Sequence, residues 1–385
     1  MLRASGVYQG WVGHENLGDE VMWQVCRTCF PSIQWSIMNT LSAGIGQDAV
    51  SRMVREPAWV WRVAREELHD GSRTRLVLKK WRHRLRSVLA GEVGLLGGGT
   101  LINRNEAVLR EYVTLRRRLK RPIPVFGTGV ANYGYWNKTS GWVDLRKEWV
   151  QVLQELPVIG VRGPQSRQEL EDAGLRNVIV CGDPAVMMHE PLGPHLPTSD
   201  RLTIGINFGM PVGGTQGAFD EIEQRLAAIA KDTALKHTVR VLPVWTRDVS
   251  ACQRLARRAD LPVSSVTLPL TTYEAFQTEI GTVDFLIAFK LHAAILAAVN
   301  NVPFVLIEYQ PKCRDFLASA GCERYGLDPR DFNAEVLAEH VARASLAGND
   351  WRSEICRKMC ELSHRFDAYC TRIAPLLTEN ARASD

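Results

Sequence analysis

The sequence predicts an α/β fold, a class in which helices cover both faces of parallel sheets. Short apolar runs rich in Val, Ile and Leu alternate with helical patterns through most of the 385 residues. Many of these runs end in Gly-rich or polar turns, as in residues 92–100, 156–164, 202–209 and 283–289. Near-continuous apolar strands separated by helices are typical of parallel sheets that are buried on both sides.

Chain length and one break in the pattern predict two doubly wound, Rossmann-like domains. A chain of 385 residues is long for a single hydrophobic core. Residues 189–201 carry three prolines and no periodicity, which favours a linker between a first domain over 1–195 and a second over 202–348. The tail, 349–385, predicts a long C-terminal helix that packs back on the first domain. In such folds, ligands bind in the cleft where the strands end.

Composition argues against several functional classes. The hydrophobic content of 45% and the charged content of 23% are ordinary for folded domains. The N-terminus lacks the apolar core of a signal peptide, and the nine cysteines lack the spacing of small secreted domains, so we expect reduced thiols and a cytoplasmic location. No apolar run approaches the roughly 20 residues that span a bilayer. Cys26 and Cys29 lie on an apolar helical face, which favours core packing over redox or metal chemistry, and we expect no metal and no bound cofactor.

Two basic segments leave the kind of partner open. Residues 73–86 carry seven Arg or Lys, and 116–121 carry five, in a chain with a net charge of +5. They form either solvated helix faces or a surface that meets phosphorylated or lipid-linked substrates or an anionic membrane, with help from Trp59, Trp61 and Trp81. No nucleic-acid-binding motif is present, and the oligomeric state is left open.

The turn "GHENLGDE" at 13–20 precedes a helical pattern and has two interpretations. Asn16 and the acidic pair Asp19 and Glu20 suit the cap and the first turn of a helix. Alternatively, all three reach into the cleft, where they bind acceptor hydroxyls or act as acid or base.

Two further turns offer groups that bind anions. Gly98, Gly99 and Thr100 end an apolar strand, either as a tight turn or as a backbone cradle for an anion. Arg162 lies between a strand and the helix that begins at Pro164, where its guanidinium suits a carboxylate or phosphate. Asp183 follows another strand and either caps a turn or faces the cleft.

The apolar stretch 285–301 contains Lys290 and His292 at the predicted start of a helix. A cation there is opposed by the helix dipole, so an anionic ligand shared by the two residues explains them best. The next strand ends near Tyr309 and Lys312, which adds a cation at the same edge. Together with Arg162, these residues predict a small, multiply charged anion held between the domains.

These motifs resemble, in order, those of the polysaccharide pyruvyl transferases. The resemblance is carried by "GHENLGDE", "LLGGGTL", "VRGPQS" with "LEDAG", "GDPA" and "KLHAAILAAVNNVPFVLIEYQPK", and it covers residues 13 to about 321. Family members often carry Arg where this chain has Lys290, and Asp where it has Gly163. The resemblance implies a fold like that of the GT-B glycosyltransferases. It also implies transfer of a pyruvyl group from phosphoenolpyruvate to two hydroxyls of a sugar or lipid-linked oligosaccharide, as a cyclic ketal.

That chemistry requires cations for the donor and groups that move protons. The donor would be held by Arg162, Lys290 and Lys312. His292 would transfer protons, and Asp19 or Glu20 would activate the acceptor hydroxyl. Two alternatives remain open: a GT-B glycosyltransferase that uses a nucleotide sugar, and a non-catalytic family member that binds glycan through the basic segment.

Overall fold

The structure is a computed structural model that describes residues 4–39, 90–136, 144–190, 201–209, 216–346 and 348–378. Residues 191–200 of the linker predicted over 189–201 lie outside these ranges, as do the basic segment 73–86 and Trp59, Trp61 and Trp81. Every strand pairing between the named strands is parallel, which confirms the α/β class.

The first unit contains two short parallel sheets, in the orders β2-β1-β3 and β4-β5-β6. Parallel bridges from Leu96 to Val125 and from Ile102 to Val130 join them edge to edge. The strands are β1 (Ala4–Gly10), β2 (Ile33–Asn39), β3 (Val93–Leu96), β4 (Phe126–Thr128), β5 (Ile159–Val161) and β6 (Val178–Val180). The helices are α1 (Leu17–Cys29), α5 (Glu106–Leu119), α6 (Tyr133–Trp136), α7 (Arg146–Leu153), α8 (Pro164–Asp172) and the 3-10 turn η1 (Pro184–Met188).

The second unit has one parallel sheet in the order β11-β10-β9-β7-β8. Its strands are β7 (Thr203–Asn207), β8 (Thr238–Val241), β9 (Phe285–Ala288), β10 (Phe304–Ile307) and β11 (Gly326–Leu327). Its helices are α9 (Gln216–Ala234), η2 (Thr246–Asp248), α10 (Val249–Arg258), η3 (Val263–Ser265), α11 (Tyr273–Ile280), α12 (Leu291–Val299), α13 (Pro311–Ala320), η4 (Glu323–Tyr325) and α14 (Ala334–Leu346). In both units the order in which strands are added to the sheet reverses beside the first strand of the unit. This reversal is the switch point where doubly wound folds bind ligands.

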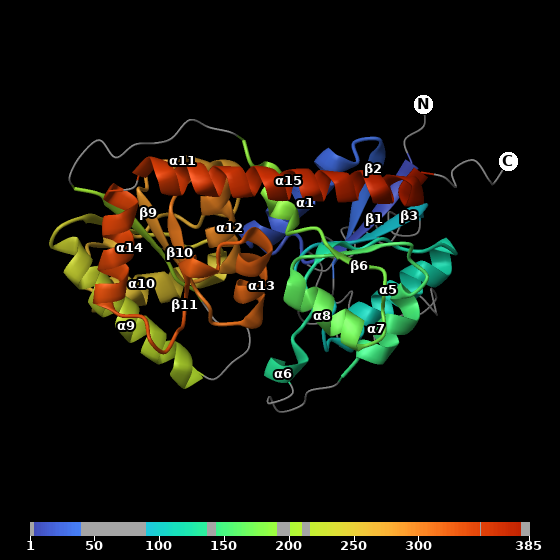
Figure 1. Ribbon diagram of the computed structural model, residues 1–385, viewed down its shortest axis with the longest axis horizontal. Helices are drawn as coiled ribbons and strands as arrows, with labels where there is room; N and C mark the ends of the chain where they lie inside the picture. Colours follow the sequence, from blue (N-terminus) through green and yellow to red (C-terminus); the bar gives the residue numbers. More distant parts are fainter. Residues whose placement is uncertain are drawn as a thin grey trace, which may run out of the picture.

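The long helix α15 (Gly348–Thr378) runs across both units (Figure 1). At one end Trp351 stacks on Tyr325 with ring centroids 4.6 Å apart. Toward the other end the Tyr369 hydroxyl accepts a hydrogen bond of 3.0 Å from the Gly160 amide and donates to the Val125 carbonyl. One helix therefore packs on the second unit and on the β4-β5-β6 sheet of the first.

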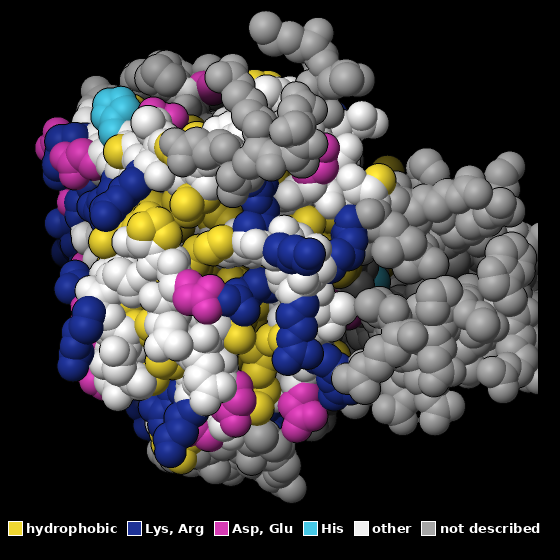
Figure 2. Space-filling view, turned by 90° about the vertical axis from the view of Figure 1, so that its right-hand side faces the viewer, with side chains coloured by type: hydrophobic (Ala, Val, Ile, Leu, Met, Phe, Trp, Pro, Cys, Tyr) yellow, Lys and Arg dark blue, Asp and Glu magenta, His cyan; other side chains and the backbone are white. Residues whose placement is uncertain are grey.

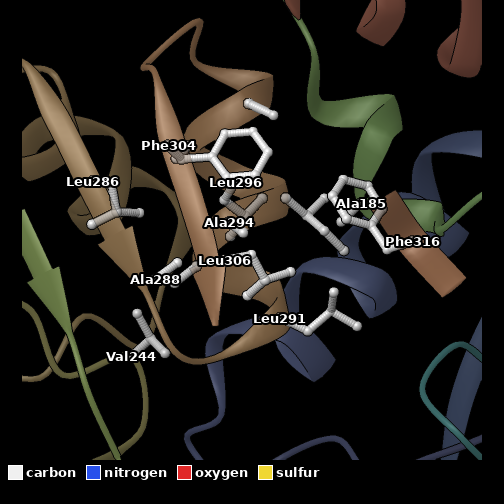
Figure 3. Close-up of a cluster of buried hydrophobic side chains, with 14 of the residues drawn as sticks. Ala185, Val244, Leu286, Ala288, Leu291, Ala294, Leu296, Phe304, Leu306 and Phe316 are labelled. Atoms are coloured by element: carbon white, nitrogen blue, oxygen red, sulfur yellow. The ribbon is translucent and has the colours of Figure 1, made fainter. Parts of the chain in front are cut away.

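The core continues from one unit into the other through α12. Every residue of this helix except His292 is buried. Figure 3 shows Leu291, Ala294 and Leu296 of α12 beside strands β9 and β10 and near Ala185, which comes from η1 of the first unit. Because α12 contacts both the sheet behind it and η1, its N-terminus is fixed at the junction of the units.

The basic residues at the end of α5 have local partners. Arg116 pairs with Glu155, and Arg118 donates a hydrogen bond of 2.9 Å to the Gly91 carbonyl. Figure 2 shows the face of the first unit that lies on the right in Figure 1. On this face, Lys and Arg side chains are interspersed with acidic and apolar ones. The described residues contain no helix that is both long and apolar enough to cross a membrane.

Candidate functional site

The turn after β1 lies against the second unit. The Leu17 amide donates a hydrogen bond of 3.0 Å to the Val244 carbonyl, and the Trp245 indole donates one of 2.9 Å to the His14 carbonyl. Asn16 caps α1 by accepting from the Gly18 amide at 3.3 Å. Its capping interpretation is therefore observed, and the cap holds the start of α1 at the junction between the units.

Arg162 and Asp183 form a solvent-free ion pair at the ends of β5 and β6. Arg162 Nε donates to Asp183 Oδ2 at 2.7 Å, and the two side chains are only 1% and 0% exposed. The other oxygen of Asp183 accepts from the Ala185 amide at 3.0 Å, so this residue also caps η1. Burial alone would raise the pKa of Asp183, but the positive charge of Arg162 and the neighbouring His292 lower it to about 2.

His292 faces the same carboxylate oxygen of Asp183. Its Nε2 is 3.6 Å from Asp183 Oδ2, and its ring packs on Gly18 at the start of α1. A Cβ atom added at Gly18 would lie 2.0 Å from His292 Nδ1, so only glycine leaves room for the ring. His292 Nε2 and Arg162 Nη2 have no hydrogen-bond partner among the residues that the structure describes. Arg162 Nη2 is therefore available to a ligand, whereas His292 Nε2 faces the Asp183 carboxylate.

Lys290 is held by residues that sequence reasoning missed. Its Nζ lies 3.2 Å from Asp248 Oδ1 and 5.3 Å from the centroid of the Trp245 ring. Its backbone amide donates to Asn207 Oδ1 at 2.8 Å. Trp245 and Asp248 follow the strand over 238–241, and that position beyond a strand was the one available sequence signal.

Lys312 is a cation of a different kind, because no carboxylate lies within ion-pair distance of it among the described residues. Its Nζ lies 5.2 Å from the centroid of the Tyr309 ring, which stacks on Phe289 at 4.2 Å. Burial, together with the like charges of Lys290 and Arg162, lowers the pKa of Lys312 to about 8. An anion beside Lys312 would relieve this repulsion.

Asp19 and Glu20, adjacent in sequence, have different environments. Burial and the negative charges of Glu20 and Asp183 raise the pKa of Asp19 to about 8, although Lys312 and Arg162 oppose the shift. Glu20 instead accepts a hydrogen bond of 2.7 Å from the Gly13 amide. Asp19 is therefore within electrostatic reach of Arg162 and Lys312, whereas Glu20 is bound within its own turn.

The glycine turn after β3 is filled largely by the protein itself. The Gly98 amide donates to the Tyr8 hydroxyl at 3.1 Å, and a Cβ atom at Gly98 would lie 2.0 Å from Met22 Sδ. Close packing therefore accounts for glycine at this position, and its amide already has an acceptor. Gly99 has a left-handed φ of 93° and faces Asp19, whose Oδ1 would lie 3.7 Å from an added Cβ.

A pocket of about 280 Å³ lies between the units, next to Arg162 and Lys312. Gly129 connects it to the ion pair, because a Cβ atom there would lie 3.0 Å from Arg162 Nη1 and 3.1 Å from Thr100 Oγ1. Both units contribute to the walls, which include Thr100, Asn103, Asn132, Gln165, Glu169 and Lys312. These walls offer amides, a hydroxyl and a cation, which are groups that bind sugar hydroxyls and anions.

The sequence profile of the polysaccharide pyruvyl transferase family matches residues 61–311. This match spans more than half of the chain and includes the turns that carry Arg162, Asp183, Lys290 and His292. The chain belongs to this family. It is accordingly a transferase that acts in polysaccharide biosynthesis. None of the curated protein sequences compared with it matches significantly.

Solved structures with a similar fold confirm the GT-B-like architecture. A UDP-GlcNAc 2-epimerase from Neisseria meningitidis, bound to UDP-GlcNAc, aligns over 97% of this chain and 99% of its own, with 8% identity and a TM-score of 0.53. The S. aureus MnaA–UDP co-structure aligns over 96% and 95%, with 10% identity and a TM-score of 0.54. A UDP-glucosyltransferase from Polygonum tinctorium aligns over 98% and 99%, with 9% identity and a TM-score of 0.52. At such identities the likeness establishes the fold alone.

The departure from the family pattern at Gly163 has a structural explanation. An added Cβ atom would lie 2.2 Å from the Asp315 carbonyl oxygen and 2.3 Å from Asp315 Oδ1. Asp315, from α13 of the second unit, accepts hydrogen bonds from the Gln165 and Ser166 amides at 2.8 and 3.2 Å. In this family member, an acidic residue from the other unit therefore caps α8, and glycine at 163 makes room for it.

Proposed function

We propose that this protein transfers the pyruvyl group of phosphoenolpyruvate to two hydroxyls of a sugar, forming a cyclic ketal and releasing phosphate. One observation carries the proposal: strand ends of both units bring three cations to a His–Asp pair beside a polar pocket. Family membership supports the same reaction class. The cytoplasmic location of the protein and its contact with an anionic membrane remain predictions.

The donor carries a carboxylate and a phosphate, which need separate cationic partners. Arg162 Nη2 is buried and unpartnered among the described residues, so it suits one of these anions. Lys312 lacks an ion-pair partner in the same part of the chain and suits the other. Lys290 is already neutralised in part by Asp248, so its charge contributes mainly to the local field. The two anionic groups of the donor would thus neutralise the positive charges of Arg162 and Lys312.

Proton transfer divides between two groups. Asp19, with a pKa of about 8, is mostly a neutral acid at pH 7 and can donate its proton to C3 of phosphoenolpyruvate. C2 then becomes electrophilic, and a sugar hydroxyl forms a bond to it while its proton passes to His292, which ionised Asp183 orients and stabilises.

The second half of the reaction completes the ketal. Breaking of the C2–O bond to phosphate releases the leaving group and regenerates an electrophilic C2. The second hydroxyl bonds to C2 and loses its proton. Of the two protons lost from the hydroxyls, one replaces the proton that Asp19 gave to C3 and the other leaves with the phosphate, so diol and phosphoenolpyruvate become ketal and hydrogen phosphate. We place the acceptor sugar in the pocket next to Thr100.

Mass spectrometry of glycans incubated with the protein and phosphoenolpyruvate tests the proposal. The expected product gains the mass of one pyruvate less one water, with phosphate released in equal amount. Free and lipid-linked oligosaccharides serve as acceptors, and His292→Ala serves as the inactive control. If uridine diphosphate, but not phosphoenolpyruvate, raises the melting temperature, and UDP-sugars are consumed, the protein is a nucleotide-sugar transferase and the proposal is wrong.

A further inference from the structure

Three side chains with metal-binding chemistry gather where η1 meets α15, outside the site described above. His189 directly follows η1, and Cys356 and Cys360 lie one turn apart on α15. One ligand atom from each residue lies within 4.8 Å of the others, and all three residues are partly buried. Sequence patterns do not reveal this cluster, because 167 residues separate His189 from Cys356.

The distances suit a small tetrahedral ion. His189 Nε2 lies 3.4 Å from Cys360 Sγ and 3.7 Å from Cys356 Sγ. With zinc bonds of about 2.3 Å to sulfur and about 2.0 Å to nitrogen, neighbouring ligand atoms of a tetrahedron are about 3.5 Å apart. The two distances from Nε2 therefore match such a site, and the two sulfur atoms lie within 4.8 Å of each other.

The orientation of the imidazole ring points to the same chemistry. His189 Nδ1 lies 2.9 Å from the Val299 carbonyl, which can only accept, so Nδ1 carries the proton. Nε2 then presents one lone pair to two thiols, and only one S–H group at a time can donate to it. A ring N–H bonded to a backbone carbonyl is the outer contact that orients metal-binding histidines. A metal ion would satisfy all three groups together.

We propose that His189, Cys356 and Cys360 bind one zinc ion, with a fourth position filled by water or another small ligand. Binding releases the two thiol protons to solvent. The ion joins α15 to the end of η1, whose beginning is capped by Asp183, and thereby fixes the C-terminal helix at the junction of the units. Neither His189 nor the two cysteines takes part in the pyruvyl transfer proposed above, so the two proposals fail independently.

Metal substitution in the full-length protein tests this site. Reduced protein, freed of metal with a chelator, is titrated with Co²⁺ and then Zn²⁺. We expect one equivalent to bind, with the thiolate-to-cobalt charge-transfer absorption and intense visible bands of a tetrahedral site, both lost when Zn²⁺ displaces Co²⁺. Zn²⁺ should also raise the melting temperature.

Three variants assign the ligands. Cys356→Ser, Cys360→Ser and His189→Ala should each weaken zinc binding by more than the roughly 10- to 100-fold typical of losing an outer contact. Cys29→Ser removes a partly exposed thiol outside the cluster and should bind zinc as the wild type does. Circular dichroism shows whether each variant is folded.

Two results would overturn the proposal. The first is zinc affinity in Cys356→Ser and Cys360→Ser equal to that of the wild type, which would mean that the metal binds elsewhere. The second is the absence of thiolate-to-cobalt absorption when the reduced wild-type protein is titrated with Co²⁺. Air oxidation of the same protein then tests whether Cys356 and Cys360 join in a disulfide bond. If that disulfide forms and cobalt does not bind, the two cysteines are a redox site and not a zinc site.

Discussion

Each unit holds a buried carboxylate beside a cation where its strands end, but the two pairs differ in their access to water. Arg162 and Asp183 in the first unit are 1% and 0% exposed, whereas Lys290 in the second unit is 13% exposed beside the buried Asp248. Asp183 also serves His292, while Asp248 has no such second role in the proposed chemistry. In the proposed reaction the solvent-free pair would therefore lie at the reacting centre, and Lys290 would contribute mainly its positive charge.

Removal of Asp183 should have the largest effect. Asp183→Asn leaves the Arg162 charge buried without compensation, so we expect about 3–5 kcal/mol less stability and loss of activity. Asp248→Asn should cost less, because Lys290 can turn toward solvent. Asp328→Asn is the matched control: its pKa is also about 2, but its partner Arg330 is exposed, so the change should cost no more than about 1 kcal/mol.

Urea unfolding at several pH values measures this difference. The folded pKa of Asp183, about 2, lies below the unfolded value of about 4. Its stabilisation is therefore complete above pH 4 and is lost as the pH falls toward 2. Equal unfolding free energies for Asp183→Asn and Asp328→Asn would show that the buried pair has no special role.

Replacement of His292 removes a group that faces Asp183 and has no counterpart beside Asp248 in the proposed reaction. His292→Ala should reduce kcat by about 10²- to 10⁴-fold while the protein stays folded. His364→Ala, an exposed change on α15, is the control and should leave kcat unchanged. Steady-state kinetics with phosphoenolpyruvate measure both. Retention of full kcat in His292→Ala would assign proton transfer to another residue.

The two lysines of the second unit should differ in donor binding. Lys312→Met removes the uncompensated charge, so we expect the donor KM to rise by about 10- to 100-fold. Lys290→Met should have a smaller effect, because Asp248 already balances that charge. The donor KM of the wild type should also rise above about pH 8, where Lys312 loses its proton, and Lys312→Arg should remove this rise. A donor KM that is flat between pH 7 and 9 in the wild type would contradict this role.

Asp19 titrates in the same range, and kcat separates it from Lys312. Since Asp19 must be neutral to donate a proton, kcat should fall above about pH 8 in the wild type and in Lys312→Arg alike. Asp19→Asn should lose most of its kcat at every pH. A kcat that keeps rising between pH 8 and 9 in the wild type would assign the acid role elsewhere.

The smallest expected effect concerns the cap that Asp315 provides across the junction. Asp315→Ala should cost about 1–2 kcal/mol and raise the acceptor KM, because α8 lines the pocket. Thr272→Ala removes the cap of α11 within one unit and should cost about 1 kcal/mol without a change in KM. Denaturant melts and acceptor titrations compare the two. An unchanged acceptor KM in Asp315→Ala would limit Asp315 to a stabilising role.

Local sequence patterns were enough to predict the fold and the edge of the sheets at which the candidate site residues lie. Apolar runs broken by glycine and polar turns predict parallel strands, and parallel strands bring all their carboxyl ends to one edge. Arg162, Asp183, Lys290 and His292 were therefore placed near the junction from local pattern alone. For Gly98 the sequence left a tight turn and an anion cradle open, and its close packing on Met22 favours the tight turn.

The pairing of the charges follows from the three-dimensional fold and could not be predicted from the sequence. Asp183 lies between Arg162 and His292, Asp248 neutralises Lys290, and Lys312 is without an acidic partner in the described part of the chain. The cap from Asp315 and the His–Cys cluster on α15 follow the same rule. Ion pairs, caps and metal sites depend on distances of a few ångströms between residues remote in sequence, and hydrophobic periodicity carries no information about such distances.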